Sequence, residues 1–168
     1  MYTADSRPYV ALLLATFFDE TMRVKITFPE TSPLKVLSIP VRIGDLNYGG
    51  HVGNDAILSI MQEARMQWLA SAGMTELEVG GHGLIMADVM VAYRGESFYG
   101  DVLQVSLYVG DKSATAFDLL YRIIALRHGD EYLIAEAKSG MVCFDYQRRK
   151  VVAMTPVLKG LLEEQIDG

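Results

Sequence analysis

The amino-acid sequence predicts an α+β fold in which one long helix packs against one antiparallel sheet. Two observations support this prediction. Apolar residues recur at helical spacing between residues 54 and 73, and they then recur at every second position over four long segments. The chain shows no repeated alternation of strands and helices, which a parallel sheet would require.

The predicted elements follow one another with clear boundaries. Val36 to Ile43 is rich in β-branched residues and predicts a strand, which leads into a glycine-dense loop from Gly44 to Gly53. Asn54 is a good N-cap for the helix that follows, and Asp55 places a negative charge in its first turn. Gly73 lies just past the end of this helix.

The helix carries a broad apolar stripe. Its members lie about one turn apart along the helix and are Ile57, Met61, Ala64, Trp68 and Ala72, with Leu58, Ile60 and Leu69 beside them. A helix that is apolar over so much of its circumference is largely enclosed. Its length of about 27 Å suits a helix wrapped by a curved sheet.

The segments after the helix predict long strands separated by turns. They are Leu84 to Tyr93, Val102 to Val109, Ala114 to Leu126 and Tyr132 to Tyr146. The last three are joined by short loops, so we expect an antiparallel meander. Val157 to Ile166 predicts a short helix after Pro156. The sheet should therefore contain five or six strands.

Length and charge limit the classes of function. The 168 residues, of which 51% are hydrophobic, fit one domain with a real core, and we assign it to residues 22–168. Residues 1–21 are set apart as an N-terminal extension, whose apolar run is too short to span a bilayer. A net charge of -6 without a stripe of basic residues excludes nucleic acid as the main partner, and we expect no membrane partner.

Cysteine and histidine usage predicts neither a disulfide nor a metal site. The single cysteine, Cys143, cannot form an internal disulfide and fits the reducing cytoplasm, and its apolar neighbours favour a role in core packing. His51, His82 and His128 lack the spacing of a zinc site. We therefore expect no metal and no cofactor.

One stretch carries a specific motif. Residues 41–69, VRIGDLNYGGHVGNDAILSIMQEARMQWL, resemble the hotdog-fold 4-hydroxybenzoyl-CoA thioesterase-like family, which has a D-x-D-x-x-G-H-V-x-N loop and a helix ending in E-E-A-R. Residues 98–103 are similar to the beginning of a family strand, and the resemblance extends over residues 36–146. It implies a homodimer or a dimer of dimers. It also implies an acyl-CoA site at the dimer interface near the start of the helix, where a thioester is hydrolysed to free acid and CoA.

The sequence departs from the family pattern at two positions that bear on the chemistry. Asn47 stands where many family members have the aspartate that serves as general base or nucleophile, and an amide cannot accept a proton at neutral pH. Gln62 stands where the first glutamate of E-E-A-R is expected. The direct matches are Asp45, His51, Asn54, Glu63 and Arg65.

The start of the helix is the expected place for the thioester. Backbone N–H groups of a first helical turn are unpaired and lie at the positive end of the helix dipole, so they can stabilise an oxyanion. Glycines before the helix let a carbonyl approach closely, although they also suit a plain tight loop. The predicted substrate-binding residues are Tyr48, Gly50, Gly53, Asn54 and Asp55.

Asp88 is the first candidate for the base that activates water. It interrupts the apolar segment Leu84 to Val91, and a carboxylate among such neighbours is costly to bury unless it is paired or functional. Burial would favour its protonated form and bring its proton affinity into the range of a general base. The alternative is an outward-facing strand residue.

Four other residues complete the predicted catalytic set. Glu63 is the second candidate for the base, and its alternative role is a salt bridge within the helix. Asp45 either acts directly or stabilises the loop, and His51 either acts as a base or makes structural hydrogen bonds. Asn47 would position water or the carbonyl by hydrogen bonds.

Two other functions remain open. Asp45 and Asn47, followed by His51 and Asp55, are similar to the D-x-N-P-x-H motif of hotdog (R)-specific enoyl-CoA hydratases, although the spacing is one residue longer and Tyr48 replaces the proline. A non-catalytic protein that binds acyl-CoA or an acyl carrier would also fit the missing acid at position 47. Thioester hydrolysis is the function that the sequence favours.

Overall fold

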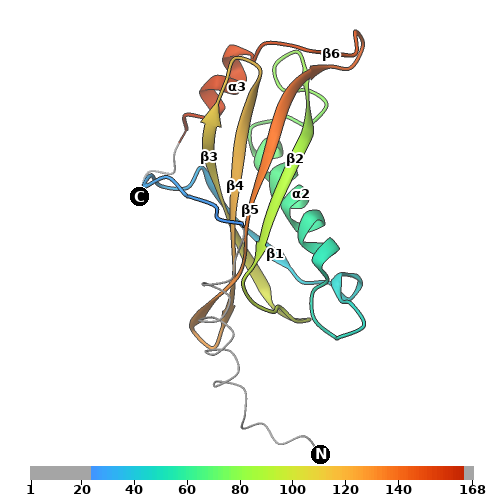
Figure 1. The fold of residues 1–168 in the computed structure, drawn as a ribbon, viewed down its shortest axis with the longest axis vertical. Coiled ribbons are helices and arrows are strands. Elements are labelled where there is room, and N and C mark those ends of the chain that lie inside the picture. Colours follow the sequence, from blue (N-terminus) through green and yellow to red (C-terminus); the bar gives the residue numbers. More distant parts are fainter. Residues whose placement is uncertain (1–23, 165–168) are drawn as a thin grey trace, which may run out of the picture.

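The computed structural model describes residues 24–164 and confirms one long helix against one antiparallel sheet (Figure 1). The prediction made for residues 1–21 lies outside the described residues. The elements in chain order are β1 (Lys35–Pro40), the 3-10 helix η1 (Ile43–Asp45), α2 (Asn54–Ser71), β2 (Gly83–Tyr93), β3 (Val102–Lys112), β4 (Ala116–Arg127), β5 (Asp130–Asp145), β6 (Lys150–Val151) and α3 (Pro156–Leu161). No helix among these is long and apolar enough to cross a membrane.

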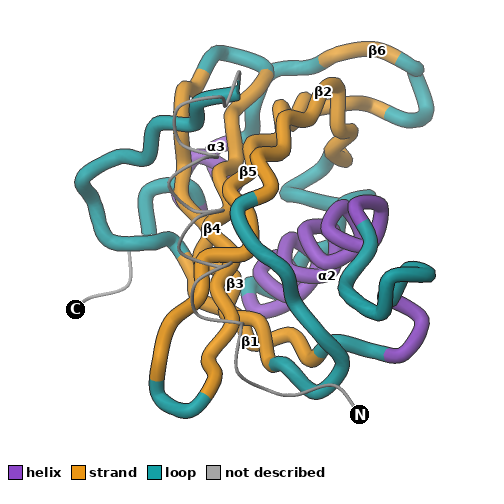
Figure 2. The backbone as a smooth tube through the Cα atoms, turned by 60° about the horizontal axis from the view of Figure 1, so that its bottom comes forward, coloured by secondary structure: helices purple, strands orange, loops and turns teal. Residues whose placement is uncertain are grey.

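The sheet has the order β1-β3-β4-β5-β2, and the short β6 pairs with β5. The antiparallel meander β3-β4-β5 is therefore confirmed. The main strands lie within three residues of their predicted ends, and β6 is an addition that the sequence did not predict. In Figures 1 and 2, η1 lies beyond the N-terminal end of α2, and Figure 1 shows α3 at the opposite end of the sheet.

Side chains of β4 point alternately to the two faces of the sheet, and Leu120 is buried on the face opposite α2. The residues on the α2 side are all buried and are Phe117, Leu119, Tyr121, Ile123 and Ala125. On the opposite face, the Phe28 ring packs edge-on against Tyr108 at 5.2 Å, and the Arg122 guanidinium lies 4.3 Å from its centroid. The segment that precedes β1 thus covers part of the face that α2 leaves free.

The ends and faces of the helices differ from the prediction in three details. The N-cap of α2 is Gly53, which is extended and offers no side chain, so Asn54 is the first helical residue rather than the cap. Leu58 is 39% exposed, so the apolar stripe is narrower than predicted. Helix α3 begins after its cap Thr155 and ends at Leu161 rather than at Ile166, which itself lies outside the described residues.

A buried polar network fastens the middle of α2 to the sheet. Arg65 Nη1 donates to the Tyr121 hydroxyl at 3.1 Å, and this hydroxyl lies 3.0 Å from Ser139 Oγ. Arg65 is 5% exposed and the other two residues are fully buried. Arg65 Nε also pairs with Glu76 in the loop after α2. Burial raises the pKa of Tyr121, so its hydroxyl stays protonated and can donate to Ser139.

We expect Tyr121→Phe to lower the free energy of unfolding by about 1–3 kcal/mol, because it leaves Arg65 and Ser139 with one partner fewer in the core. Urea unfolding followed by circular dichroism measures this change. The matched control is Tyr132→Phe, at a residue that is 40% exposed, which should change stability little. Equal effects of the two substitutions would contradict a stabilising role for the network.

Candidate active site

Two loops meet at the N-terminal end of α2. The first contains η1 and runs to Gly53, and the second covers residues 94–101. Val52 N–H donates to the Ser97 carbonyl at 2.8 Å, and Gly53 N–H donates to the Asp45 carbonyl at 2.9 Å. These backbone bonds fix the direction in which the chain enters the helix.

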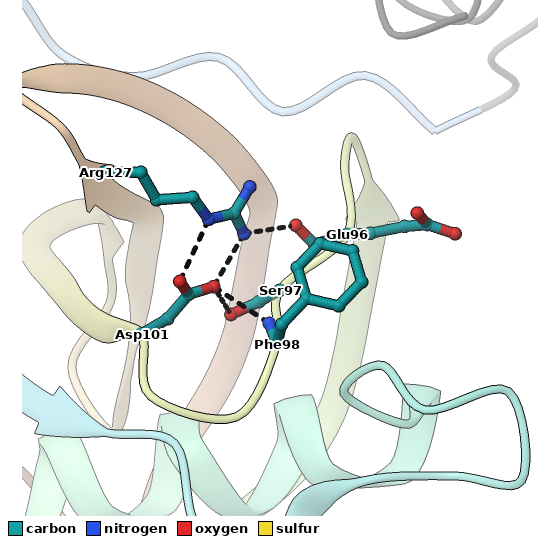
Figure 3. A network of polar contacts seen from close by, with 5 residues as sticks. All are labelled: Glu96, Ser97, Phe98, Asp101 and Arg127. Carbon is teal, nitrogen blue, oxygen red and sulfur yellow. Dashed lines mark hydrogen bonds and ion pairs between the residues drawn. The ribbon is translucent and has the colours of Figure 1, made fainter. Parts of the chain in front are cut away.

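An ion pair holds the second loop in place (Figure 3). Arg127 Nε and Nη2 donate to the two carboxylate oxygens of Asp101 at 2.9 and 2.6 Å, and Nη2 also donates to the Glu96 carbonyl at 2.7 Å. Ser97 Oγ and Phe98 N–H donate to the same carboxylate at 2.8 Å each. Partial burial alone would raise the pKa of Asp101, but these four donors outweigh it and hold the pKa at about 2.

The first turn of α2 offers free donors. Among the described residues, the backbone N–H groups of Asn54, Asp55 and Ala56 have no hydrogen-bond partner. Gly53 has no side chain, and the Asp55 carboxylate lies close to it. A Cβ added there would meet Asp55 Oδ1 at 2.5 Å and Asn47 Cβ at 3.6 Å. The three N–H groups can donate to a substrate oxygen, as an oxyanion site must, once the Asp55 side chain is turned away from Gly53.

Tyr93 is a residue of this end of the helix that the sequence analysis missed. Its hydroxyl donates to the Asn54 carbonyl at 3.1 Å, and partial burial together with the charge of Asp55 raises its pKa. It is the last residue of β2, and only the strand register brings it to the helix. An aromatic residue at the end of a predicted strand was the sole signal in the sequence.

Asn47 and His51 lie side by side in the first loop. Asn47 Oδ1 accepts from Gly49 N–H at 2.8 Å, and its Nδ2 lies 3.4 Å from His51 Nδ1. The same ring nitrogen lies 3.2 Å from the Val52 carbonyl. On the other side of the ring, His51 Nε2 lies 3.9 Å from Glu96 Oε1. The predicted substrate residues Tyr48 and Gly50 flank this cluster and are exposed.

Asp45 and Glu63 belong to a separate pocket between β1 and α2. Both residues line this pocket of about 230 Å³, together with Arg42 and Gln62. Asp45 Oδ2 accepts from Arg42 N–H at 2.7 Å and so stabilises η1. Glu63 Oε1 accepts from Gln67 Nε2 at 2.8 Å, a hydrogen bond within the helix where the sequence suggested a salt bridge. Both carboxylates thus already have local partners.

Asp88 lies on the face of the sheet opposite α2 and is exposed. The premise that it is buried among apolar residues is therefore wrong. A β-bulge between Met86 and Asp88 shifts the register, so that Asp88 pairs with Gly140 rather than with Ser139 on the α2 side. The structure does not bring Asp88 together with Asn47 and His51.

Cys143 is buried, and burial raises the pKa of its thiol. The protonated thiol is a poor nucleophile, which confirms the prediction that this residue packs in the core. Within residues 24–164, no group of three acidic, histidine or cysteine side chains is close enough to hold a metal ion.

The low pKa of Asp101 leads to a prediction about acid stability. Because the folded pKa of about 2 lies below the unfolded value of about 3.9, the stabilisation by Asp101 is complete above pH ~5 and is lost progressively as the pH falls through 4 toward 2. We expect Asp101→Asn to be less stable than the parent at pH 7 and to lose less stability between pH 4 and pH 2. Thermal unfolding across this range measures both effects, with the exposed Asp130→Asn as control. Parallel curves for parent and Asp101→Asn would contradict the assignment.

Comparisons with solved structures give the fold. The 1,4-dihydroxy-2-naphthoyl-CoA thioesterase from Synechocystis is 23% identical, with a TM-score of 0.67 over 76% of this chain and 93% of its own. A putative thioesterase from Pseudomonas aeruginosa is also 23% identical, with a TM-score of 0.68 over 76% and 97%. An Asp-to-Asn mutant of 4-hydroxybenzoyl-CoA thioesterase, complexed with 4-hydroxybenzoyl-CoA, is 15% identical, with a TM-score of 0.69 over 77% and 98%. The chain thus has the hotdog fold that the sequence predicted.

The family follows from the sequence match. A search of curated protein sequences gave no match. The model of the thioesterase-like superfamily, however, matches residues 41–162. That range begins just before η1, contains α2 and the whole meander, and ends just after α3. Because the match spans most of the chain and includes both loops of the candidate site, the chain belongs to the thioesterase-like superfamily.

Proposed function

We propose that the protein hydrolyses acyl-CoA thioesters at the N-terminal end of α2. One observation carries this proposal: the first turn of α2 presents unpaired N–H groups behind Gly53, and Asn47 and His51 lie in the loop that leads to it. Structural neighbours named for thioesters of CoA with aromatic acids support CoA thioesters as the substrate class.

The geometry suits the two requirements of thioester hydrolysis. The carbonyl oxygen accepts hydrogen bonds from the N–H groups of residues 54–56, which become stronger as negative charge develops on it. The Asn47 amide, already oriented by Gly49, lies at the edge of this space and can donate to water or substrate. A base takes the proton of the attacking water, and the C–S bond then breaks to give the free acid and CoA.

We further propose that the site lies at a dimer interface along β2. This strand is at the edge of the sheet, so one side of its backbone has no partner strand within the described chain. Met86 and Met90 on it are 46% and 38% exposed, and Tyr93 at its end contacts α2. Antiparallel pairing of two β2 strands would cover these residues and place both helix starts near the interface.

Light scattering is expected to show a dimer, or a dimer of dimers, at micromolar concentration. Replacing both Met86 and Met90 by lysine should shift the protein toward monomers, because charges on an edge strand prevent pairing. Replacing Leu126 and Leu133 by lysine is the matched control, since these residues are similarly exposed at 43% and 38% but belong to β4 and β5. A parent protein that is only monomeric would contradict the interface.

The parent protein is expected to release thiol from a panel of aromatic and aliphatic acyl-CoAs. Gly53→Val should abolish release, because its Cβ would lie 2.5 Å from Asp55 Oδ1 and the new side chain would crowd the first turn of α2, where the free N–H groups lie. Gly44→Val is the matched control, since a Cβ at Gly44 meets nothing within 4 Å. Circular dichroism checks that both variants fold.

Three outcomes would contradict this function. Binding of acyl-CoA without turnover would make the protein a binder, and loss of enoyl-thioester absorbance without thiol release would make it a hydratase. Unchanged kinetics in Gly53→Val would show that the carbonyl binds elsewhere. Asp88→Asn belongs in the same assay. Because Asp88 is exposed, the substitution should change thiol release little, and a loss of thiol release would instead identify Asp88 as the base.

A further inference from the structure

We propose that His51 and Glu96 together hold the hydrolytic water, and that His51 Nε2 is the base that takes its proton. This inference rests on the proposed hydrolysis of thioesters and assigns the base that Asn47 cannot supply. Glu96 belongs to none of the sequence motifs described above, and it lies 45 positions from His51 along the chain. The two residues come from the two loops that meet at the start of α2.

The separation of the two side chains fits a shared water. His51 Nε2 and Glu96 Oε1 are 3.9 Å apart, which is too long for a direct hydrogen bond. A polar gap of this size is commonly bridged by a water that bonds to both groups. The side chains are 32% and 62% exposed, so water and substrate can reach them.

The surrounding structure positions Glu96 for this contact. Its carbonyl accepts from Arg127 Nη2 at 2.7 Å, which ties its backbone to the Arg127–Asp101 ion pair. Figure 3 shows that its carboxylate points away from that pair. Among the described residues, the contact of the Glu96 carboxylate is the one with His51 at 3.9 Å, and no hydrogen bond engages it. It is therefore free to act on His51.

The His51 ring is held in one orientation. A Cβ at Gly49 would lie 3.0 Å from Nε2 and 3.2 Å from Cδ2, so the ring packs closely over the Gly49 backbone. Nδ1 lies 3.2 Å from the Val52 carbonyl, which can only accept, and this favours the tautomer with the proton on Nδ1 and the lone pair on Nε2. The Asn47 amide nitrogen, at 3.4 Å from Nδ1, favours the opposite tautomer but is the longer contact.

The proposed step balances in protons and electrons. The water oxygen forms a bond to the thioester carbon while one of the water protons moves to His51 Nε2. The π electron pair of the C=O bond moves to the carbonyl oxygen. The N–H groups of the first turn of α2 hold that oxyanion. The intermediate then collapses, the C–S bond breaks, and the CoA sulfur takes the electron pair and the proton from His51. Glu96 stabilises the imidazolium between these two transfers.

The first test compares substitutions in the full-length protein. His51→Asn keeps an amide donor near the Val52 carbonyl but removes the base, so kcat should fall by about a hundredfold or more with KM nearly unchanged. Glu96→Gln, at the residue that acts through the water and the ring, should lower kcat by about tenfold. The control is Glu131→Gln, at an exposed acid of β5. If His51→Asn has the same kcat as the parent protein, the assignment of His51 as the base is overturned.

The second test displaces the ring without touching it. Gly49→Ala places a methyl group 3.0 Å from His51 Nε2 and 3.1 Å from Asn47 Oδ1, so it crowds both side chains and should lower kcat, whereas Gly44→Ala meets nothing within 4 Å and should not. Neither glycine has a positive φ, so alanine introduces no backbone strain at either position. Equal rates for the two variants would overturn the proposed role of the ring orientation.

The third test reads the ring directly. Nitrogen NMR of the histidine rings, with the His51 signals assigned by their loss in His51→Asn, should show neutral His51 protonated on Nδ1. The Nε2-protonated tautomer would overturn the proposal, whatever the activity. An inactive parent on all acyl-CoAs would overturn both this inference and the proposed function, while an active parent with a full-rate His51→Asn would overturn this inference alone.

Discussion

The ion pair between Asp101 and Arg127 is the interaction on which the candidate site depends. It closes residues 94–101 into a fixed loop, and Val52 pairs with that loop through the Ser97 carbonyl. The direction of α2 and the position of its free N–H groups follow from this backbone pairing. Because Arg127 lies at the end of β4, the meander itself supports the site, and a change in strand register would move the loop and the start of the helix together.

The helix is fixed at two points by different means. At its start the contacts are backbone hydrogen bonds and one tyrosine hydroxyl, whereas at its middle Arg65 reaches Tyr121 and Ser139 in the core. A purely apolar contact would allow α2 to slide over the sheet, since hydrophobic burial has no direction. Directional polar contacts in the core set its position along its own axis, and this position determines where the first turn meets the two loops.

The periodicity of the sequence was sufficient to predict the fold but not the grouping of the site residues. Alternation and helical spacing depend on local side-chain pattern, and they placed the strands and α2 correctly. The prediction that Asp88 is buried was wrong because a single-residue bulge after Met86 moves every later residue of β2 to the other face. No local sequence pattern indicates this bulge. Glu96 was missed for a related reason, since its proximity to His51 arises only when two loops distant in sequence meet.

The same meeting of loops explains why an amide is tolerated at position 47. Asn47 Oδ1 caps the Gly49 N–H and its Nδ2 lies beside His51, so the side chain has a structural use that an aspartate could meet only in part. A carboxylate at position 47, in addition to those of Asp55 and Glu96, would add negative charge where the thioester oxygen must also become negative. An amide avoids that repulsion while still offering a donor. Asn47 in place of an aspartate is therefore compatible with catalysis in this geometry, because the proposed base is the neighbouring imidazole of His51.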